Sequence, residues 1–149
     1  MRSTVLLSVA LLSLASRAAA AQASADSAAI KETALNYIEG WYEANPDRMA
    51  KAVHGDLAKQ IVVRDRPRAR EFVRDMSATE LIEGTRGGGG SQTPAERRRR
   101  DVTILDISYG KAASVKVVAS DWVDYLHVAK VDGQWKIVNV LWERTPATP

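Results

Sequence analysis

The sequence predicts an α+β domain in which helices pack on one face of an antiparallel sheet. Apolar residues recur at helical spacing between residues 30 and 53, whereas residues 102–143 alternate in the manner of strands. An Asp132-Gly133 pair separates two runs rich in β-branched and aromatic residues, which is the strongest short-range signal for a hairpin. Because the helical patterns come first and most strands come last, an α+β arrangement is favoured over alternating βαβ units.

The first 21 residues have the pattern of a cleavable secretory signal. Arg2 precedes an apolar run from Val5 to Leu14, and residues 18–21 are four alanines. This run is shorter than the ~20 residues that a membrane-spanning helix needs. We therefore expect cleavage after Ala21, a secreted or periplasmic product, and no membrane contact after cleavage. Residues 22–27 are expected to form a flexible leader, residues 28–144 the domain, and residues 145–149 a tail.

Two helices should follow the leader. The first carries an apolar face from Ile30 onward and should end before Pro46, because proline disfavours helical geometry in the residue before it. Asn45 and Pro46 then suit the cap and first position of a short second helix. Gly55 is expected to end this second helix.

The middle of the chain contains one strand, one helix and two arginine-rich segments. Residues 58–64 read as a short strand, and Arg64–Arg70 as irregular chain. Ser77 and Glu80 form a capping box that should begin a third helix ending at Gly84, before a glycine-rich loop at 87–90. Strands are then expected over residues 102–107 and 113–120, ahead of the hairpin.

Composition excludes several classes of function. The chain has no cysteine, so disulfides and thiolate chemistry are absent, and two histidines without clustered ligand spacing argue against a metal site. The net charge of +3 falls further when Arg2 and Arg17 leave with the signal. The basic run Arg97–Arg100 contains no aromatic residue to stack on bases, so we expect no nucleic-acid partner. No sequence motif indicates a cofactor.

The register of the final hairpin decides which residues face the helices. A two-residue turn at Asp132-Gly133 pairs Val131 with Gln134, and this register is preferred. A three-residue turn with a bulge would shift the pairing by one, and the sequence leaves this alternative open. In the preferred register the inner face carries Trp122, Asp124, Leu126, Val128, Trp135, Ile137, Asn139 and Leu141. The outer face is apolar enough to predict a homodimer through Val123, Tyr125, His127, Val138, Val140 and Trp142.

These features together resemble a known superfamily. The helical pair ending in His54-Gly55-Asp56-Leu57, the late strands, and the segment Trp122–Glu143 resemble nuclear transport factor two-like domains, and within them the putative lumazine-binding group. The resemblance implies a cone-shaped fold of the cystatin-like kind, with a curved sheet wrapped over the helices and a pocket at the open end. Such relatives include isomerases, cyclases, dehydratases and non-catalytic binding or dimerisation modules, so the fold alone does not select a function.

Six residues are candidates for lining a ligand site in that pocket. They are Tyr37, Trp41, His54, Trp122, Asp124 and Asn139. The leading hypothesis is an exported protein that binds a small ligand in a conical apolar pocket. One alternative is an enzyme of the isomerase, cyclase or dehydratase type that uses Asp124 or His54 as a general base. Another is a structural or dimerisation module without a ligand.

Overall fold

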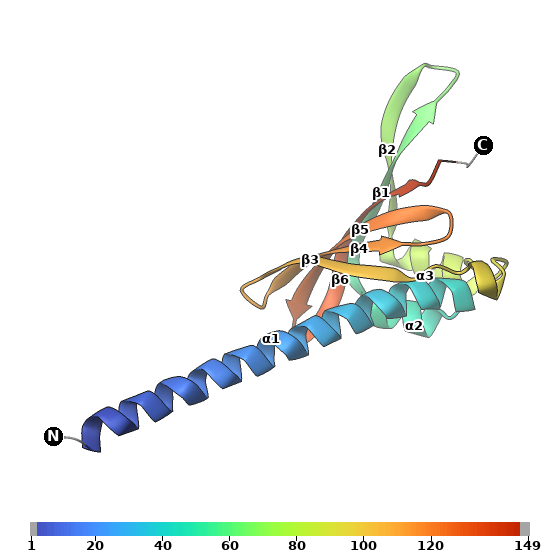
Figure 1. Cartoon of the computed structure of the whole chain (residues 1–149). Helices are drawn as coiled ribbons and strands as arrows, with labels where there is room; N and C mark the ends of the chain where they lie inside the picture. The colour runs from blue at the N-terminus through green and yellow to red at the C-terminus, as the bar shows by residue number, and fades with distance from the viewer. Residues whose placement is uncertain (1–2, 147–149) are drawn as a thin grey trace.

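The computed structural model describes residues 3–146 and contains three α-helices and one six-stranded sheet (Figure 1). The helices are α1 (Ser3–Glu43), α2 (Pro46–Ala52) and α3 (Ala78–Arg86). The strands are β1 (Val53–Asp65), β2 (Arg70–Ser77), β3 (Asp101–Ser108), β4 (Ala112–Val118), β5 (Trp122–Val131) and β6 (Gln134–Arg144). A single 3-10 turn covers Ala95–Arg97. The predicted α+β class is confirmed.

The strands are ordered β2-β1-β6-β5-β4-β3, and the curved sheet does not close. Every neighbouring pair is antiparallel except β1 and β6, which run parallel, so the sheet is mixed rather than purely antiparallel. The helices lie against one side of this sheet, and the β1–β2 hairpin extends away from them (Figure 1). β6, the last strand in sequence, therefore lies inside the sheet between β1 and β5.

The predicted helix caps are confirmed. The Asn45 side chain accepts a hydrogen bond from the Arg48 backbone N–H at 3.0 Å, with Pro46 in the first turn of α2. Ser77 and Glu80 form the reciprocal capping box of α3. The predicted ends of these helices are wrong: α2 stops at Ala52 because Val53 adopts extended geometry, so that Gly55 lies in β1, and α3 continues past Gly84 to Arg86.

Helix α1 is longer than the amphipathic pattern predicts. In place of a flexible leader at residues 22–27, the structure has helix. Asp26 explains this, because its buried carboxylate accepts hydrogen bonds from Lys130 Nζ at 2.7 Å and Trp135 Nε1 at 3.1 Å. These contacts tie the segment to the β5–β6 hairpin. Among the helices that the structure describes, none combines the length and apolar character needed to span a membrane.

The final hairpin combines features of both registers that the sequence left open. The turn at Asp132-Gly133 has two residues, and Val131 pairs with Gln134 as preferred. After the Val128–Ile137 pair a bulge in β6 shifts the register by one residue, so that His127 faces Asn139. The prediction that Asn139 and Leu141 face the helices is therefore wrong.

The same bulge changes the predicted outer face. Val140 is completely buried in the core, and Trp142 also turns inward. Both were predicted to lie on the dimerising face, and both predictions are wrong. Leu141, which is 50% exposed, takes its place on the outer side, opposite Tyr125 of β5.

The prediction of irregular chain over residues 64–70 is also partly wrong. Residues 70–77 form β2, which pairs with β1 along its length, and β1 itself begins at Val53 rather than at residue 58. The core that these strands share with the helices joins α1 to the middle of the sheet. Its fully buried members include Ile30, Ile38, Met49, Val115, Val117, Ile137 and Val140.

Candidate functional site

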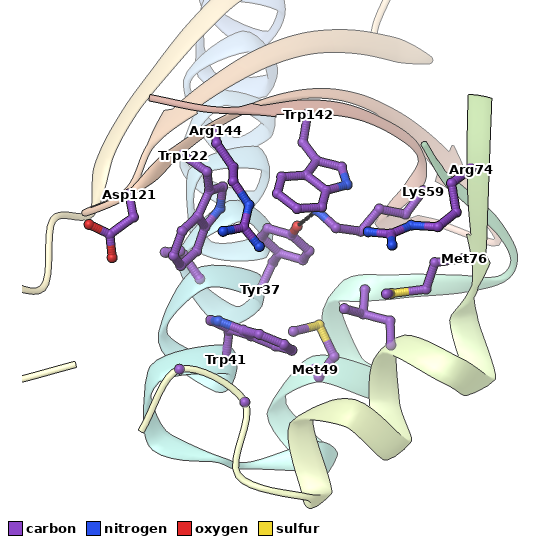
Figure 2. A pocket seen from close by; sticks show the side chains of 14 residues that line it. Tyr37, Trp41, Met49, Lys59, Arg74, Met76, Asp121, Trp122, Trp142 and Arg144 are labelled. Carbon is purple, nitrogen blue, oxygen red and sulfur yellow. Dashed lines mark hydrogen bonds between the residues drawn. The ribbon is translucent and has the colours of Figure 1, made fainter. Parts of the chain in front are cut away.

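A pocket of about 400 Å³ opens between α1, the α2–α3 pair and the strands β1, β2, β5 and β6 (Figure 2). Its walls are mostly apolar. Its basic side chains come from the sheet, and its acidic side chain, Asp121, comes from the turn before β5. The lining residues are Tyr37, Ile38, Trp41, Met49, Lys59, Arg74, Met76, Leu81, Gly89, Gly90, Asp121, Trp122, Trp142 and Arg144.

The innermost polar groups of the pocket form one hydrogen-bonded network. Lys59 Nζ lies 2.7 Å from the Tyr37 hydroxyl oxygen and 2.7 Å from Asp124 Oδ1. The Tyr37 hydroxyl donates to the same carboxylate oxygen at 3.2 Å. Trp122 Nε1 donates to the other oxygen, Oδ2, at 2.7 Å. Every member of this network therefore has a partner, although Asp124 is completely buried and the Lys59 side chain is only 8% exposed.

Strand alternation brings these residues together. Lys59 lies between Leu57 and Ile61 on the inward side of β1, and Asp124 lies between Trp122 and Leu126 on the inward side of β5. β6 separates the two strands and contributes Trp142, which pairs with Asp124. The ammonium of Lys59 lies 4.8 Å from the centre of the Trp142 ring, within the range of a cation–π contact.

Burial changes the acid–base properties of this network. Loss of hydration lowers the pKa of Lys59 below its usual value, and the adjacent Asp124 carboxylate opposes that shift. Burial, and then the charge of Asp124, raise the pKa of Tyr37 well above its usual value. Tyr37 therefore keeps its proton at neutral pH and acts as a hydrogen-bond donor to Asp124. Of the four residues in the network, Tyr37, Lys59 and Trp122 line the pocket and Asp124 does not.

Three tryptophans provide the aromatic surface of the pocket. Trp41 comes from α1, Trp122 from β5 and Trp142 from β6. The glycine-rich loop is held against Trp41, since the Gly90 N–H donates to the Trp41 carbonyl at 2.9 Å. A Cβ at Gly90 would lie 2.6 Å from the Trp41 ring, so only glycine permits this approach. The loop that the sequence predicts as flexible thus forms part of the pocket wall.

The structure brings some of the predicted site residues together and separates others. Tyr37, Trp41 and Trp122 line the pocket, whereas Asp124 lies behind Lys59 and is not part of the lining. His54 is outside the pocket, where its Nδ1 accepts the Asp56 N–H at 3.2 Å. Asn139 points to the opposite side and donates to the Ala58 carbonyl at 3.0 Å.

Sequence reasoning missed eleven of the fourteen lining residues, and five of these come from strands. Lys59, Arg74, Met76, Trp142 and Arg144 were not among the candidates. Alternation could have placed Lys59 beside the apolar Leu57 and Ile61, and a lysine at such a position indicates a buried partner. Across the described residues, no group of three or more histidine, cysteine, aspartate or glutamate side chains is arranged to hold a metal ion.

Comparison with solved structures places this fold among known ones. A nuclear transport factor 2-like protein of unknown function from Shewanella baltica superposes with a TM-score of 0.63 at 20% identity, covering 83% of this chain and 97% of that one. A similar protein from Silicibacter pomeroyi gives 0.64 at 16% identity, with coverage of 83% and 98%. A putative scytalone dehydratase from Novosphingobium aromaticivorans gives 0.54 at 17% identity, with coverage of 85% and 89%.

At these identities the solved structures establish the fold and not a shared activity. No curated protein matches the sequence. The sequence profile of the family described as putative lumazine-binding matches residues 25–143, which is most of the chain and contains every residue that lines the pocket except Arg144. The chain belongs to the putative lumazine-binding family.

Proposed function

We propose that this protein binds a small planar aromatic or heterocyclic molecule in the tryptophan-lined pocket. The observation that carries the proposal is the combination of three tryptophans with a small polar cluster around Lys59 at the inner end of an apolar cavity. A volume of about 400 Å³ lies in the range of small-molecule sites, which are mainly apolar with a few polar groups that fix orientation. Rings that stack on indoles fit such a surface.

The open cavity supports a binding role over a purely structural one, because a structural module would fill this space with its own side chains. It also limits the enzyme alternative. Neither His54 nor Asp124 lines the pocket, so neither is placed to take a proton from a ligand. An enzyme built on this site would have to use Lys59, whose lowered pKa and contact with Tyr37 are the observations that favour catalysis.

Ligand-induced stabilisation tests the binding proposal. The protein is screened by thermal shift and tryptophan fluorescence against a panel of aromatic heterocycles that includes lumazine. Trp142→Ala removes one wall of the pocket. Leu141→Ala changes the preceding residue of β6, which lies on the outer face, and is the matched control. We expect a stabilising ligand whose effect disappears with Trp142→Ala and persists with Leu141→Ala. A panel that leaves stability and fluorescence unchanged would refute the proposal.

The same screen distinguishes an enzyme from a protein that only binds its ligand. A catalyst should convert a bound compound to a product that mass spectrometry detects, and Lys59→Met should abolish conversion at ligand concentrations that still saturate the site. Bound compounds that are recovered unchanged support binding alone.

We also propose that the protein is exported, on the strength of the signal pattern in residues 1–21. Amino-terminal sequencing of protein recovered outside the cytoplasm should give Gln22 as the first residue. A product that retains residues 1–21 would contradict the proposal.

A homodimer through the outer sheet face remains part of the proposed function. After the register correction, Val123, Tyr125, His127 and Val138 remain of the predicted set and Leu141 joins them. Tyr125 and Leu141 are 42% and 50% exposed and pair across β5 and β6, so they form the centre of an exposed apolar patch. Sedimentation at micromolar concentration should give a dimer that Leu141→Lys dissociates, and a monomeric wild-type protein would exclude it.

A further inference from the structure

More basic than acidic side chains line the pocket. Lys59 is neutralised by Asp124, but Arg74 and Arg144 also line the pocket, and within residues 3–146 neither side chain has an ion pair or hydrogen bond. Among the described residues the one acidic side chain in the lining is Asp121, which is 65% exposed and lies 3.8 Å from Arg97. Two exposed arginines without an acidic partner among the described residues therefore lie beside an apolar cavity.

Strand alternation places the side chains of Arg74 and Arg144 on the same side of the sheet as Lys59. Arg74 of β2 pairs with Ile61 of β1, two residues from Lys59 and on the same side of the strand. Arg144 follows Trp142 by two residues in β6 and therefore shares its inward side. Figure 2 shows the two guanidinium groups extending over the cavity on either side of the Lys59 ammonium.

We infer that the ligand carries an anionic group, a carboxylate or a group of similar shape, on its planar ring. The ring stacks on the tryptophans, and the anion lies between Arg74 and Arg144 at the mouth of the pocket. A guanidinium binds a carboxylate through two parallel hydrogen bonds. A neutral ring would fill the cavity but leave both arginine charges without a partner. This inference rests on the proposed binding function.

A matched pair of probes tests the charge and the cavity separately. 2-Naphthoate and 2-naphthamide have the same ring and nearly the same shape, and only the first is anionic at neutral pH. We expect calorimetry or tryptophan quenching to show naphthoate binding at least tenfold tighter than naphthamide. The difference should shrink as salt rises, because screening weakens attraction between exposed charges.

Variants identify the groups responsible. The double variant R74Q/R144Q should weaken naphthoate at least tenfold and leave naphthamide within about twofold. R66Q, which removes an exposed arginine at the tip of the β1–β2 hairpin, is the control and should change neither affinity. Equal affinities for the two probes in the wild-type protein would overturn the inference and leave the binding proposal intact. Failure of both probes and of the heterocycle panel to bind would overturn both.

Discussion

Replacing Asp124 with asparagine tests how strongly the fold depends on the carboxylate behind the pocket. The substitution keeps the size of the side chain and removes its charge, which leaves the Lys59 ammonium without an anion at 8% exposure. It also places an amide donor against either Trp122 Nε1 or Lys59 Nζ, both of which donate to the carboxylate now. Breaking a buried ion pair in this way costs about 3–5 kcal/mol, and we expect about 3 kcal/mol because the amide oxygen still accepts one partner.

The pH dependence of this loss has a definite sign. The pKa of Lys59 already lies below its usual value of 10.5, and removing Asp124 removes the interaction that opposes this shift. Between the folded and unfolded pKa values the unfolded chain binds more protons than the folded chain, so stability rises with pH. The stability of Asp124→Asn should therefore recover as pH increases from 7 toward 10, with a slope of at most about 1.4 kcal/mol per pH unit.

Urea unfolding followed by circular dichroism at pH 7, 8 and 9 measures these changes, provided that the dependence on urea is the same in each variant. Glu83→Gln is the control, because its ion pair with Arg86 is exposed at both ends (60% and 59%) and should contribute less than about 1 kcal/mol. Lys59→Met combined with Asp124→Asn should remove the extra slope. A loss below about 1 kcal/mol, or a slope equal to that of the wild type, would refute the buried-pair reasoning.

Four further substitutions test other parts of the structure. Asp26→Asn should lower the melting temperature near pH 6. The hydrogen bond from Lys130 is the main reason that the pKa of Asp26 is lowered, so the stabilisation is present above pH 3.8 and is lost as pH falls through the folded-state pKa. The melting temperatures of variant and wild type should therefore converge in acid. Gly89→Ala should cost about 1–3 kcal/mol in urea unfolding, since Gly89 has a φ of +48° and a Cβ there would lie 2.5 Å from a backbone oxygen of α1. Val140→Ala should cost about 2–3 kcal/mol and Leu141→Ala less than about 0.5 kcal/mol, and the reverse order would contradict the bulged register.

The parts of the fold that the sequence predicts correctly are those determined by neighbouring residues. Asn45 and Pro46 begin α2, Ser77 begins α3, and Asp132-Gly133 turns the hairpin, because each device involves contacts within a few positions of the chain. The α+β class follows from such elements and their order.

The errors occur where distant segments meet. β6 is bulged after Ile137, and its parallel partner β1 shifts register between Val53 and Ala58 at the same point of the sheet. Because β1 lies some eighty positions earlier in the chain, no count along the hairpin alone predicts the bulge. This single shift moved Asn139 and Trp142 to the faces opposite to those predicted.

The candidate site was predictable only in part for a similar reason. Tyr37, Trp41 and Trp122 are aromatic residues on inward faces, and periodicity suffices to place them. The burial of Lys59 depends on Asp124, which comes from a strand two places away in the sheet. Alternation along β1 can place Lys59 on an inward face, but it does not identify the acidic partner that makes burial of a lysine tolerable.

The position of β6 has a consequence for how the chain acquires its structure. This strand follows the other five in the chain, yet it joins β1 to β5 and so connects the two halves of the sheet. Until residues 134–144 arrive, the earlier strands can form separate hairpins but no continuous sheet, and such long-range pairing is slow to form. A nascent chain therefore has no continuous sheet until β6 has been made, and deletion of residues 134–144 should abolish cooperative folding rather than remove one edge of the sheet.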